Sequence, residues 1–381
     1  MRTSLAGRLL AGLVLACVAG PIAPAGAGDA SPAPVAPSHP APPPDPSVPA
    51  PPLPAPPPPP AVPAPGSTSV ASVPPGLLLG EFTLPPDPVT DGDTIRLPAG
   101  APAKSVRVAC VDAEEVWHKG EEADRAAAER DFDAYAKAKR GDAATPRKFG
   151  TPAGEAAKAF VKELFRGVTA VRLERDAPGR DFDGYGRVLA HVFLAKDGRD
   201  LLMGEALVRA GWSPYFVKYG RSRRFDARFE AAQIEARAAR RGIWGDAVKH
   251  YPDYPDRLVW WESRARQVDA WREDVAKAKD PSTMIELGVR AETARLEGLL
   301  GRTATVFGSL DHEITDRPPK RILLVDRPDA PFPLVVFDPK VWAAIDHPSV
   351  QAAFVRVTGV LTEFRGRPQI KIEDPSAIST R

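Results

Sequence analysis

Three short charged clusters carry residue types that could act together on a phosphate ester. They are Asp91–Thr94 (DGDT), Arg107–Glu115 (RVACVDAEE) and Asp183–Arg187 (DGYGR). Carboxylates can hold a hard dication, guanidinium groups pair with phosphoryl oxygens, and a further glutamate can take a proton from water. Each cluster alone is typical of an ordinary turn or loop. Their combination in one chain favours phosphodiester chemistry.

Strands and a hairpin are expected to position these clusters. The segments Val106–Val111, Val168–Leu173 and Val188–Leu194 are rich in β-branched residues and predict strands. Between the last two, residues 176–187 are rich in Asp and Gly, as a hairpin loop is. Residues 201–210 and a second segment from 225 to about 242 have helical spacing. Strands followed by helices predict a small barrel with helices packed against it.

The spacing within the second cluster gives a geometric expectation. Arg107 and Asp112 are five residues apart, so a regular strand would direct them to opposite faces. Both can reach one phosphate only if the strand bends or ends between them. We therefore predict a bulge or strand end near Val111.

The segment of about residues 80–245 resembles the staphylococcal nuclease (thermonuclease) family. The resemblance is carried by five segments in the family's order, namely Thr90–Ile95, Arg107–Asp112, Tyr185–Arg187, Glu205–Arg209 and Gly242–Trp244. It implies an OB-fold nuclease barrel. The fold class expected for the whole chain is α+β: this barrel, a helical connector and a second OB-like barrel.

The resemblance also implies roles for individual residues. The catalytic residues would be Arg107 and Arg187, which bind the scissile phosphate, and Glu115, which acts on the attacking water. The ligands of a Ca²⁺ ion would be the carboxylates of Asp93 and Asp112 and the backbone carbonyl of Ala113. Substrate contacts are expected from Tyr185 and Tyr219, and from Arg365 in the C-terminal barrel.

This sequence departs from the family pattern at several positions. Ala113 and Glu114 replace a Thr and a Pro, and Glu114 could compete with Glu115 for the role of base. Gly184 replaces a loop lysine, which weakens phosphate attraction. The insertion 116–148 is charged and rich in Ala, which predicts either a helical flap near the site or a solvated insertion without a role.

A basic run at residues 218–224 follows the barrel strands. It predicts either phosphate contacts or a solvated helix start. The cysteine of the second cluster, Cys110, is expected to be a buried, inert thiol in an apolar strand.

The N-terminal quarter of the chain has a different composition. Residues 1–27 combine arginines, an apolar run and an A-x-A pattern, which predicts a signal peptide and export; lipidation at Cys17 is the alternative. Residues 28–76 are expected to form a disordered linker, since 19 of the 34 residues from 32 to 65 are proline.

The C-terminal part predicts two further domains. Residues 248–300 read as a helical connector whose Trp260, Trp261 and Trp271 bury against a neighbouring domain, with a stacking platform as the alternative. In residues 301–381, three predicted strands, a helix and two strands match an OB-like domain. Such barrels bind nucleic acids, sugars or proteins.

Overall charge is nearly balanced, with 51 Lys and Arg against 49 Asp and Glu, so a strongly basic nucleic-acid binder is excluded. The sequence favours an exported (secreted or envelope) Ca²⁺-dependent nuclease acting on DNA, RNA or both. The alternative is a catalytically inactive nuclease-like barrel that binds nucleic acid or serves as a scaffold.

Overall fold

The computed structural model describes most of the chain from residue 76 onward. It covers residues 76–143, 145–176, 179–183, 185–196, 198–315, 317–327 and 329–380. The expected signal peptide, Cys17 and the Pro-rich linker lie outside these residues, as does Gly184. Across the described ranges no helix is both long and apolar enough to cross a membrane.

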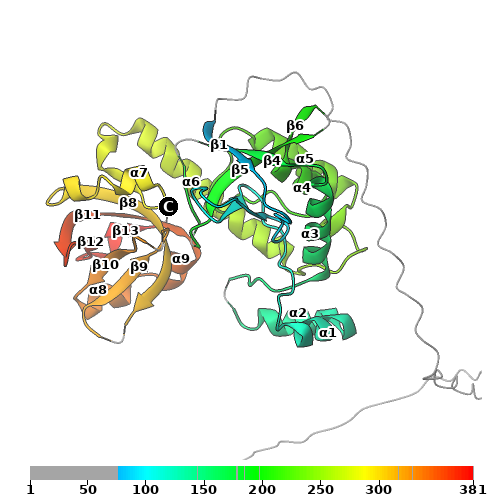
Figure 1. Ribbon diagram of the computed structural model, residues 1–381. Helices are drawn as coiled ribbons and strands as arrows, with labels where there is room; N and C mark the ends of the chain where they lie inside the picture. Colours follow the sequence, from blue (N-terminus) through cyan, green and yellow to red (C-terminus); the bar gives the residue numbers. More distant parts are fainter. Residues whose placement is uncertain are drawn as a thin grey trace, which may run out of the picture. The chain divides into compact units, whose positions relative to one another are not determined.

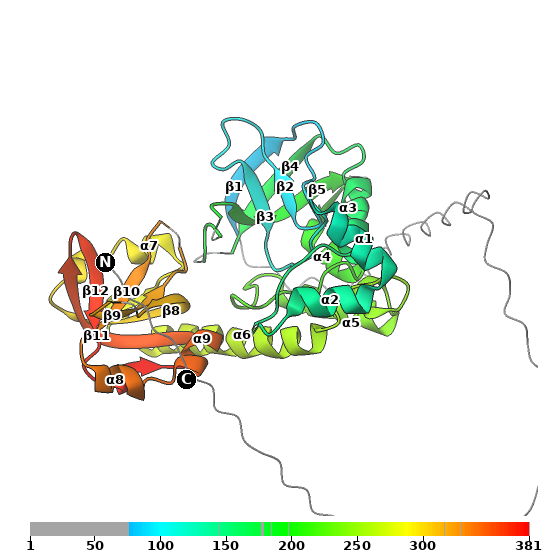
Figure 2. The same ribbon diagram turned by 90° about the horizontal axis from the view of Figure 1, so that it is seen from below.

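The first barrel consists of five strands in the order β1-β4-β5-β3-β2 (Figures 1 and 2). The strands are β1 (Leu77–Thr83), β2 (Thr94–Arg96), β3 (Ser105–Val108), β4 (Ala170–Arg175) and β5 (Val188–Lys196). β3 and β5 pair in parallel and the other neighbours are antiparallel. A sixth strand, β6 (Arg199–Leu202), pairs antiparallel with the end of β5. The described residues form no ladder between β1 and β2, so this barrel is open at that seam.

Three helices cover the first barrel: α3 (Pro152–Leu164), α4 (Met203–Arg209) and α5 (Asp226–Ala238). Helix α3 begins where Thr151 accepts a hydrogen bond from the backbone N–H of Gly154, with Pro152 in its first turn. Its residues Phe160, Val161 and Leu164 recur at helical spacing and join the core inside the strands. The expected helices after the barrel strands are confirmed, with ends shifted by a few residues.

The insertion forms two short helices, α1 (Glu122–Arg130) and α2 (Phe132–Arg140). Asp131 separates them and caps α2 by accepting from the backbone N–H of Ala134 at 3.0 Å. A small apolar cluster holds the pair together; it contains Ala128, Phe132, Tyr135 and Ala136, packed against Trp117 and Phe149. The helical prediction for this insertion is therefore confirmed.

Helix α6 (Tyr254–Lys277) joins the two barrels through its buried face. Trp261 belongs to the core of the first barrel. Nearly three turns further on, Trp271 stacks on Phe307 of the second barrel, with ring centroids 4.9 Å apart. The predicted burial of these two tryptophans is confirmed, whereas Trp260 is only partly buried.

The connector is not wholly helical, contrary to the expectation. After α6 it contains a strand, β7 (Met284–Glu286), which pairs in parallel with the first strand of the second barrel. A short helix, α7 (Arg290–Thr293), and two 3-10 turns complete it. Ile285 and Leu287 are buried in the second barrel's core, so this part of the connector is tied to that barrel.

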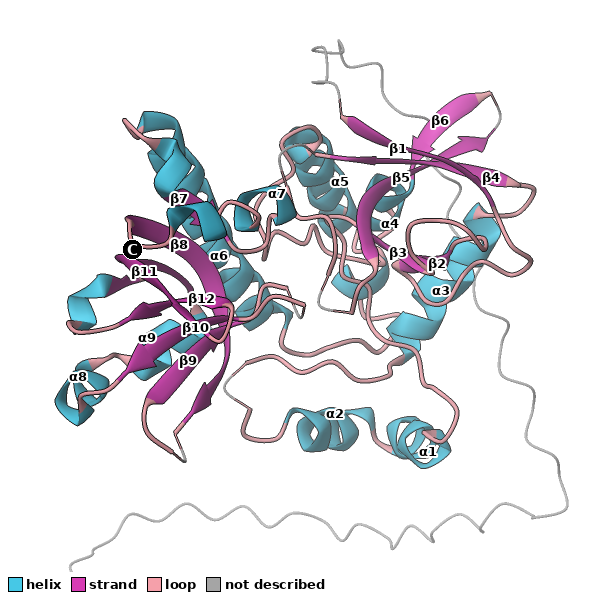
Figure 3. Cartoon of the chain, turned by 60° about the vertical axis from the view of Figure 1, so that its left-hand side comes forward, coloured by secondary structure: helices cyan, strands magenta, loops and turns pink. Residues whose placement is uncertain are grey.

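The second barrel is closed (Figure 3). Its strands are β8 (Thr303–Ile314), β9 (Lys320–Leu324), β10 (Phe332–Val336), β11 (Phe354–Phe364) and β12 (Arg367–Lys371). They follow the order β8-β9-β10-β12-β11, and β11 pairs back with β8, which gives the OB topology. Helices α8 (Pro339–Ala344) and α9 (His347–Ala352) lie between β10 and β11, and β13 (Ile378–Ser379) pairs with β11.

Candidate active site

The strand that carries Arg107 ends before Asp112, as the spacing requires. β3 stops at Val108, and Cys110 takes a left-handed backbone conformation with φ of 65°. Such a φ is uncommon for a residue other than glycine and turns the chain sharply. Cys110 therefore lies in this turn and not in a strand. Its side chain is only partly buried and lines the cleft beside this cluster, so the expected full burial is wrong, although desolvation by its surroundings raises the pKa of the thiol.

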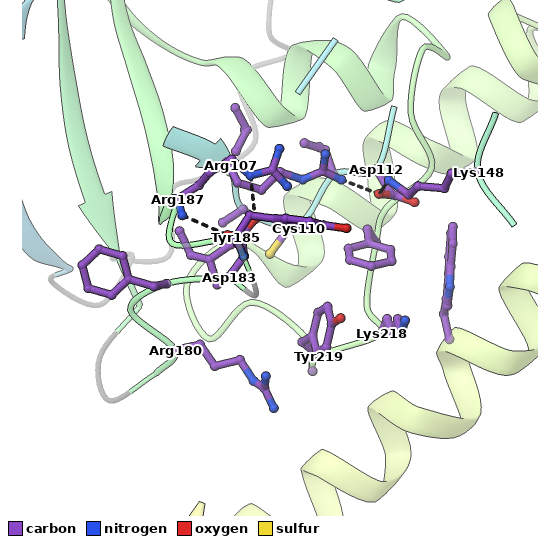
Figure 4. Close-up of a pocket in the computed structure, with 18 of the residues that line it drawn as sticks. Arg107, Cys110, Asp112, Lys148, Arg180, Asp183, Tyr185, Arg187, Lys218 and Tyr219 are labelled. Carbon is purple, nitrogen blue, oxygen red and sulfur yellow. Dashed lines mark hydrogen bonds and ion pairs between the residues drawn. The ribbon is translucent and has the colours of Figure 1, made fainter. Parts of the chain in front are cut away.

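Arg107 joins the two aspartates that the sequence pairs with it. One nitrogen of its guanidinium binds Oδ1 of Asp93. The other binds Oδ1 of Asp112 (Figure 4). Asp93 also accepts from the backbone N–H of Ala113, at 2.8 Å. The backbone N–H of Asp112 donates to Oγ of Ser213 at 2.8 Å, which fixes the loop after β3. A single fork of donors thus gathers both carboxylates.

The two carboxylates differ in protonation behaviour. Burial raises the pKa of Asp93 to about 8, although the positive charge of Arg107 opposes this. Burial also acts on Asp112, but there Lys148 and Arg107 outweigh it and the pKa is lowered. A bound dication would favour the ionised form of both.

Arg187 is attached to the same cluster through Thr94. The hydroxyl of Thr94 donates to Asp93 at 3.2 Å and accepts from Nη1 of Arg187 at 3.0 Å. Asp183 fixes the other edge of that guanidinium, because its Oδ2 lies 2.6 Å from Nε of Arg187. Its Oδ1 accepts from the backbone N–H groups of Tyr185 and Arg187, both at 2.9 Å. The hairpin therefore presents a pre-oriented guanidinium.

Glu115 reaches the cluster through a lysine that the sequence did not single out. Nζ of Lys148 lies 2.6 Å from Oδ1 of Asp112 and 3.1 Å from Oε1 of Glu115 (Figure 4). Lys148 is the last residue of the insertion, 33 positions after Glu115. The insertion thus contributes to the site by its end. The sequence did contain a signal for this lysine. An insertion that begins beside the site must also end beside it, so its last residue is a candidate for the site.

One tyrosine ties the two ends of the insertion together. The hydroxyl of Tyr251 accepts from the backbone N–H of Phe149 at 3.0 Å and of Glu115 at 3.3 Å, and donates to the carbonyl of Phe149 at 2.8 Å. The carbonyl of Glu115 accepts from Thr151 at 3.0 Å. Helix α3 approaches so closely that a Cβ on Gly154 would lie 2.0 Å from that carbonyl, so only glycine fits. The backbone at Glu115 is therefore held from two sides.

Glu114 does not compete with Glu115 for the pocket. Its side chain is buried and accepts hydrogen bonds from the hydroxyl of Thr151 and, at 2.8 Å, from the backbone N–H of Tyr251. Burial raises the pKa of Glu114 to about 7. The open question between the two glutamates is answered by geometry: Glu115 lines the cleft, and Glu114 holds α3 and the segment before α6 in place.

A cleft of about 1130 Å³ runs past this cluster, and we call it the catalytic cleft because candidate catalytic residues line it. Tyr185, which is 87% exposed, and Tyr219, which is 41% exposed, both line it, in line with their expected substrate contacts. Arg365 is not among its lining residues; it lies in the β11–β12 turn, over the ring of Phe364. The structure therefore brings all predicted side chains together except Arg365.

The basic run after α4 is divided between two kinds of environment. Arg221 pairs with Glu262 at 2.7 Å, and Arg224 pairs with Glu174 at 2.7 Å. These arginines are neutralised by the protein itself. Arg221 still lines the cleft, as do Arg223 and Lys218, and the ammonium of Lys218 lies beside the ring of Trp260.

The donor set at Asp93 and Asp112 suits a hard dication. Both side chains are buried carboxylates, the ligand type that Ca²⁺ prefers, and they share one neighbour, Arg107. In the described residues no three His, Cys, Asp or Glu side chains form a ready-made metal cluster. The remaining ligands would therefore come from a carbonyl such as that of Ala113, and from water.

Comparison with known families agrees with this geometry. Residues 105–246 match the family model described as staphylococcal nuclease homologue. No curated protein matches the chain at a significant level. The chain thus contains a staphylococcal-nuclease-like domain, and this domain indicates a nuclease or nucleic-acid-binding function.

Proposed function

We propose that this protein is a Ca²⁺-dependent nuclease that hydrolyses phosphodiester bonds of DNA, RNA or both. One observation carries the proposal: a single connected set of hydrogen bonds and ion pairs joins all five chemical side chains. The five are Asp93, Arg107, Asp112, Glu115 and Arg187. Ion pairs that only stabilised the fold would not need to converge on the wall of a large cleft.

Two arginines would receive the phosphate. Arg107 lies in β3 and binds Asp93, whereas Arg187 lies in the hairpin before β5 and binds Thr94, so their guanidinium groups can approach one phosphodiester from two directions. Each can donate paired hydrogen bonds to phosphoryl oxygens. Their contribution is to stabilise the charge that builds on those oxygens in the transition state.

Glu115 would act as the general base. Its side chain lines the catalytic cleft, and its backbone is held by Tyr251 and Thr151. A carboxylate so placed can take a proton from a water that attacks the phosphorus in line with the leaving oxygen. The bond to that leaving oxygen then breaks, and the oxygen takes a proton from solvent.

A Ca²⁺ ion held by Asp93, Asp112 and the carbonyl of Ala113 would neutralise phosphoryl charge and lower the pKa of bound water. Arg107 and Lys148 now pair with those carboxylates, so the protein's own cations keep the acidic cluster balanced until a substrate brings its phosphate. The ammonium of Lys148 also supplies positive charge to a site whose hairpin has glycine at position 184.

Export is proposed from the sequence. The arginines, apolar run and A-x-A pattern of residues 1–27 support it, with a lipid anchor at Cys17 as the alternative. Outside the cell Ca²⁺ is abundant enough to fill a weak site with two carboxylates.

A second candidate function is binding without hydrolysis. Two observations favour it: Ala113 and Glu114 replace the family's usual residues, and Arg107 occupies both carboxylates. The C-terminal barrel could then supply the contacts to a nucleic acid or a protein.

A cleavage assay separates the two functions. The purified full chain is incubated with labelled single-stranded DNA and, separately, with RNA, in Ca²⁺ or in excess chelator. We expect shortened products in Ca²⁺ that are lost in chelator and restored when Ca²⁺ is added back. Binding of the same strands without Ca²⁺-dependent products would exclude the nuclease and leave the binding function.

A further inference from the structure

Two lysines lie beside Asp112, on the opposite side of the cluster from Arg187. Figure 4 shows Lys148 and Lys218 on the Asp112 side of the catalytic cleft, with Arg187 and Tyr185 on the other. Lys148 ends the insertion, whereas Lys218 belongs to the loop after α4. Their charges act on each other and on Asp112. The two lysines therefore form a basic patch next to the catalytic cluster, outside the pair of arginines.

No ion pair joins Lys218 to a carboxylate in the part of the chain that the structure describes. Among the described residues no Asp or Glu oxygen lies within ion-pair distance of its Nζ. Its ammonium lies 4.4 Å from the ring centroid of Trp260 and 5.4 Å from that of Tyr219. Burial lowers its pKa, and the positive charge of Arg264 acts in the same direction. An ammonium group in these surroundings is stabilised when a ligand brings an anion next to it.

Lys148 has donor capacity to spare. An ammonium group carries three N–H donors, and the carboxylates of Asp112 and Glu115 use two of them. Its side chain is 38% exposed, so the third donor can reach the solvent of the cleft. Lys148 and Lys218 thus both present an ammonium group to the same cleft.

The aromatic rings specify what kind of anion. Trp260 lines the catalytic cleft and is partly exposed, while its neighbour Trp261 is buried. Tyr219 adds a second ring next to it. Cations beside aromatic faces are the usual arrangement for a nucleic-acid strand, in which phosphates alternate with bases that stack on rings.

We propose that Lys148 and Lys218 bind a second phosphate of the same strand, adjacent to the scissile one, and that Trp260 stacks on the base attached to it. The proposal rests on the proposed function in one respect, namely that the cleft binds a nucleic acid. It makes the substrate a strand of several nucleotides that spans both sites, and it gives the insertion a direct role in binding.

Binding measured without cleavage tests this subsite. Fluorescence anisotropy is recorded for the full chain in excess chelator, with a labelled thymidine dinucleotide and with a strand of about eight nucleotides. The variants are Lys218→Met and Lys148→Met, which keep an apolar side chain of similar length. Lys162→Met is the matched control, because Lys162 is an exposed lysine of α3 outside the cleft lining.

We expect the wild type to bind the longer strand at least tenfold more tightly than the dinucleotide. Each cleft variant should lose about fivefold in affinity for the longer strand and little for the dinucleotide. The dependence of log K on log salt should also fall by about 0.7 for each lysine removed. Trp260→Leu should lower the affinity for the longer strand by about tenfold. The Lys162→Met control should match the wild type in every measurement.

Other outcomes overturn the subsite. It is excluded if the wild type binds the dinucleotide and the longer strand with equal affinity. It is also excluded if the Lys218 and Lys148 variants still bind the longer strand more tightly than the dinucleotide by the same factor as the wild type. Circular dichroism melting checks that each variant is folded. Cleavage in Ca²⁺ is scored separately. Length-dependent binding without cleavage would reject the nuclease and keep the subsite. Cleavage, together with lysine variants whose binding depends on strand length as in the wild type, would keep the nuclease and reject the subsite.

Discussion

The two barrels share a strand order but use equivalent loops differently. In both, the third and fifth strands pair in parallel, and helices separate the third strand from the fourth. After the third strand, the first barrel has Asp112 and the second has Asp338. Asp338 accepts from the backbone N–H of Lys340 at 2.7 Å and so caps α8. Asp112 instead has Arg107 and Lys148 as partners.

The hairpins between the fourth and fifth strands differ in the same way. Arg187 is fixed by Asp183 and Thr94 and faces the carboxylates. Arg365, in the corresponding turn of the second barrel, is exposed and lies over Phe364. Equivalent loop positions in the two barrels thus form a charged site only where their side chains pair with charged or polar groups from other parts of the barrel. An OB topology alone does not place a nuclease site.

The largest effect should come from removing the base in the first barrel. Glu115→Gln keeps the shape of the side chain but cannot take a proton, so kcat for strand cleavage should fall by about 10² to 10⁴. Glu114→Gln is the matched control one residue away, and it should change kcat less than threefold because that side chain is buried outside the cleft. Equal losses in the two variants would contradict the assignment.

A pair of arginine variants tests whether the two hairpins have different roles. Arg187→Ala should lower kcat by about 10² to 10³, because a pre-oriented donor to the phosphate is lost. Arg365→Ala should leave kcat unchanged and affect only KM for long strands. Steady-state cleavage of a short and a long strand gives both constants. A fall in kcat for the Arg365 variant would show that the second barrel takes part in the chemistry.

The smallest expected effect concerns stability. The pKa of Glu114 is about 7 in the folded chain, above its usual 4.5, so the folded state binds more protons between these values. Stability should therefore fall as pH rises from about 4.5 to 7 and then level off. Glu114→Gln should remove this dependence and gain up to about 3 kcal/mol at pH 8 but nothing near pH 4. Urea unfolding at the two pH values measures it, and a variant less stable at pH 8 would count against the shift.

Most of the site was predictable because its residues lie in short segments with a fixed order. Asp93, Arg107 and Asp112 are each next to a strand whose pattern is clear, and the strand end before Asp112 followed from spacing alone. The alternation of apolar residues likewise gave the strands of the second barrel and the helix between them. These features depend on local sequence, which a single chain shows directly.

The remaining features depend on contacts between distant parts of the chain. The place of Lys148 is set by Tyr251 and Thr151, so its own neighbours in sequence give no sign of it. The directions of Glu114 and Glu115 are decided by the close approach of α3. Strand β7 is three residues long and forms because β8 offers an edge. Such features become visible only after the chain has folded.

The tie at Tyr251 has a consequence for where the nuclease-like domain can be cut. The family match stops at residue 246, five positions before that tyrosine. A fragment that ended at residue 246 would keep every acidic and basic group of the centre but would lose Tyr251, which holds the two ends of the insertion together. A fragment that also began at residue 105, where the match begins, would lose Asp93 and Thr94 as well. Residues of the insertion between Glu115 and Phe149 can therefore change in number without moving the centre. The C-terminal boundary of the unit that holds the site lies beyond the first barrel, in the segment that leads into α6.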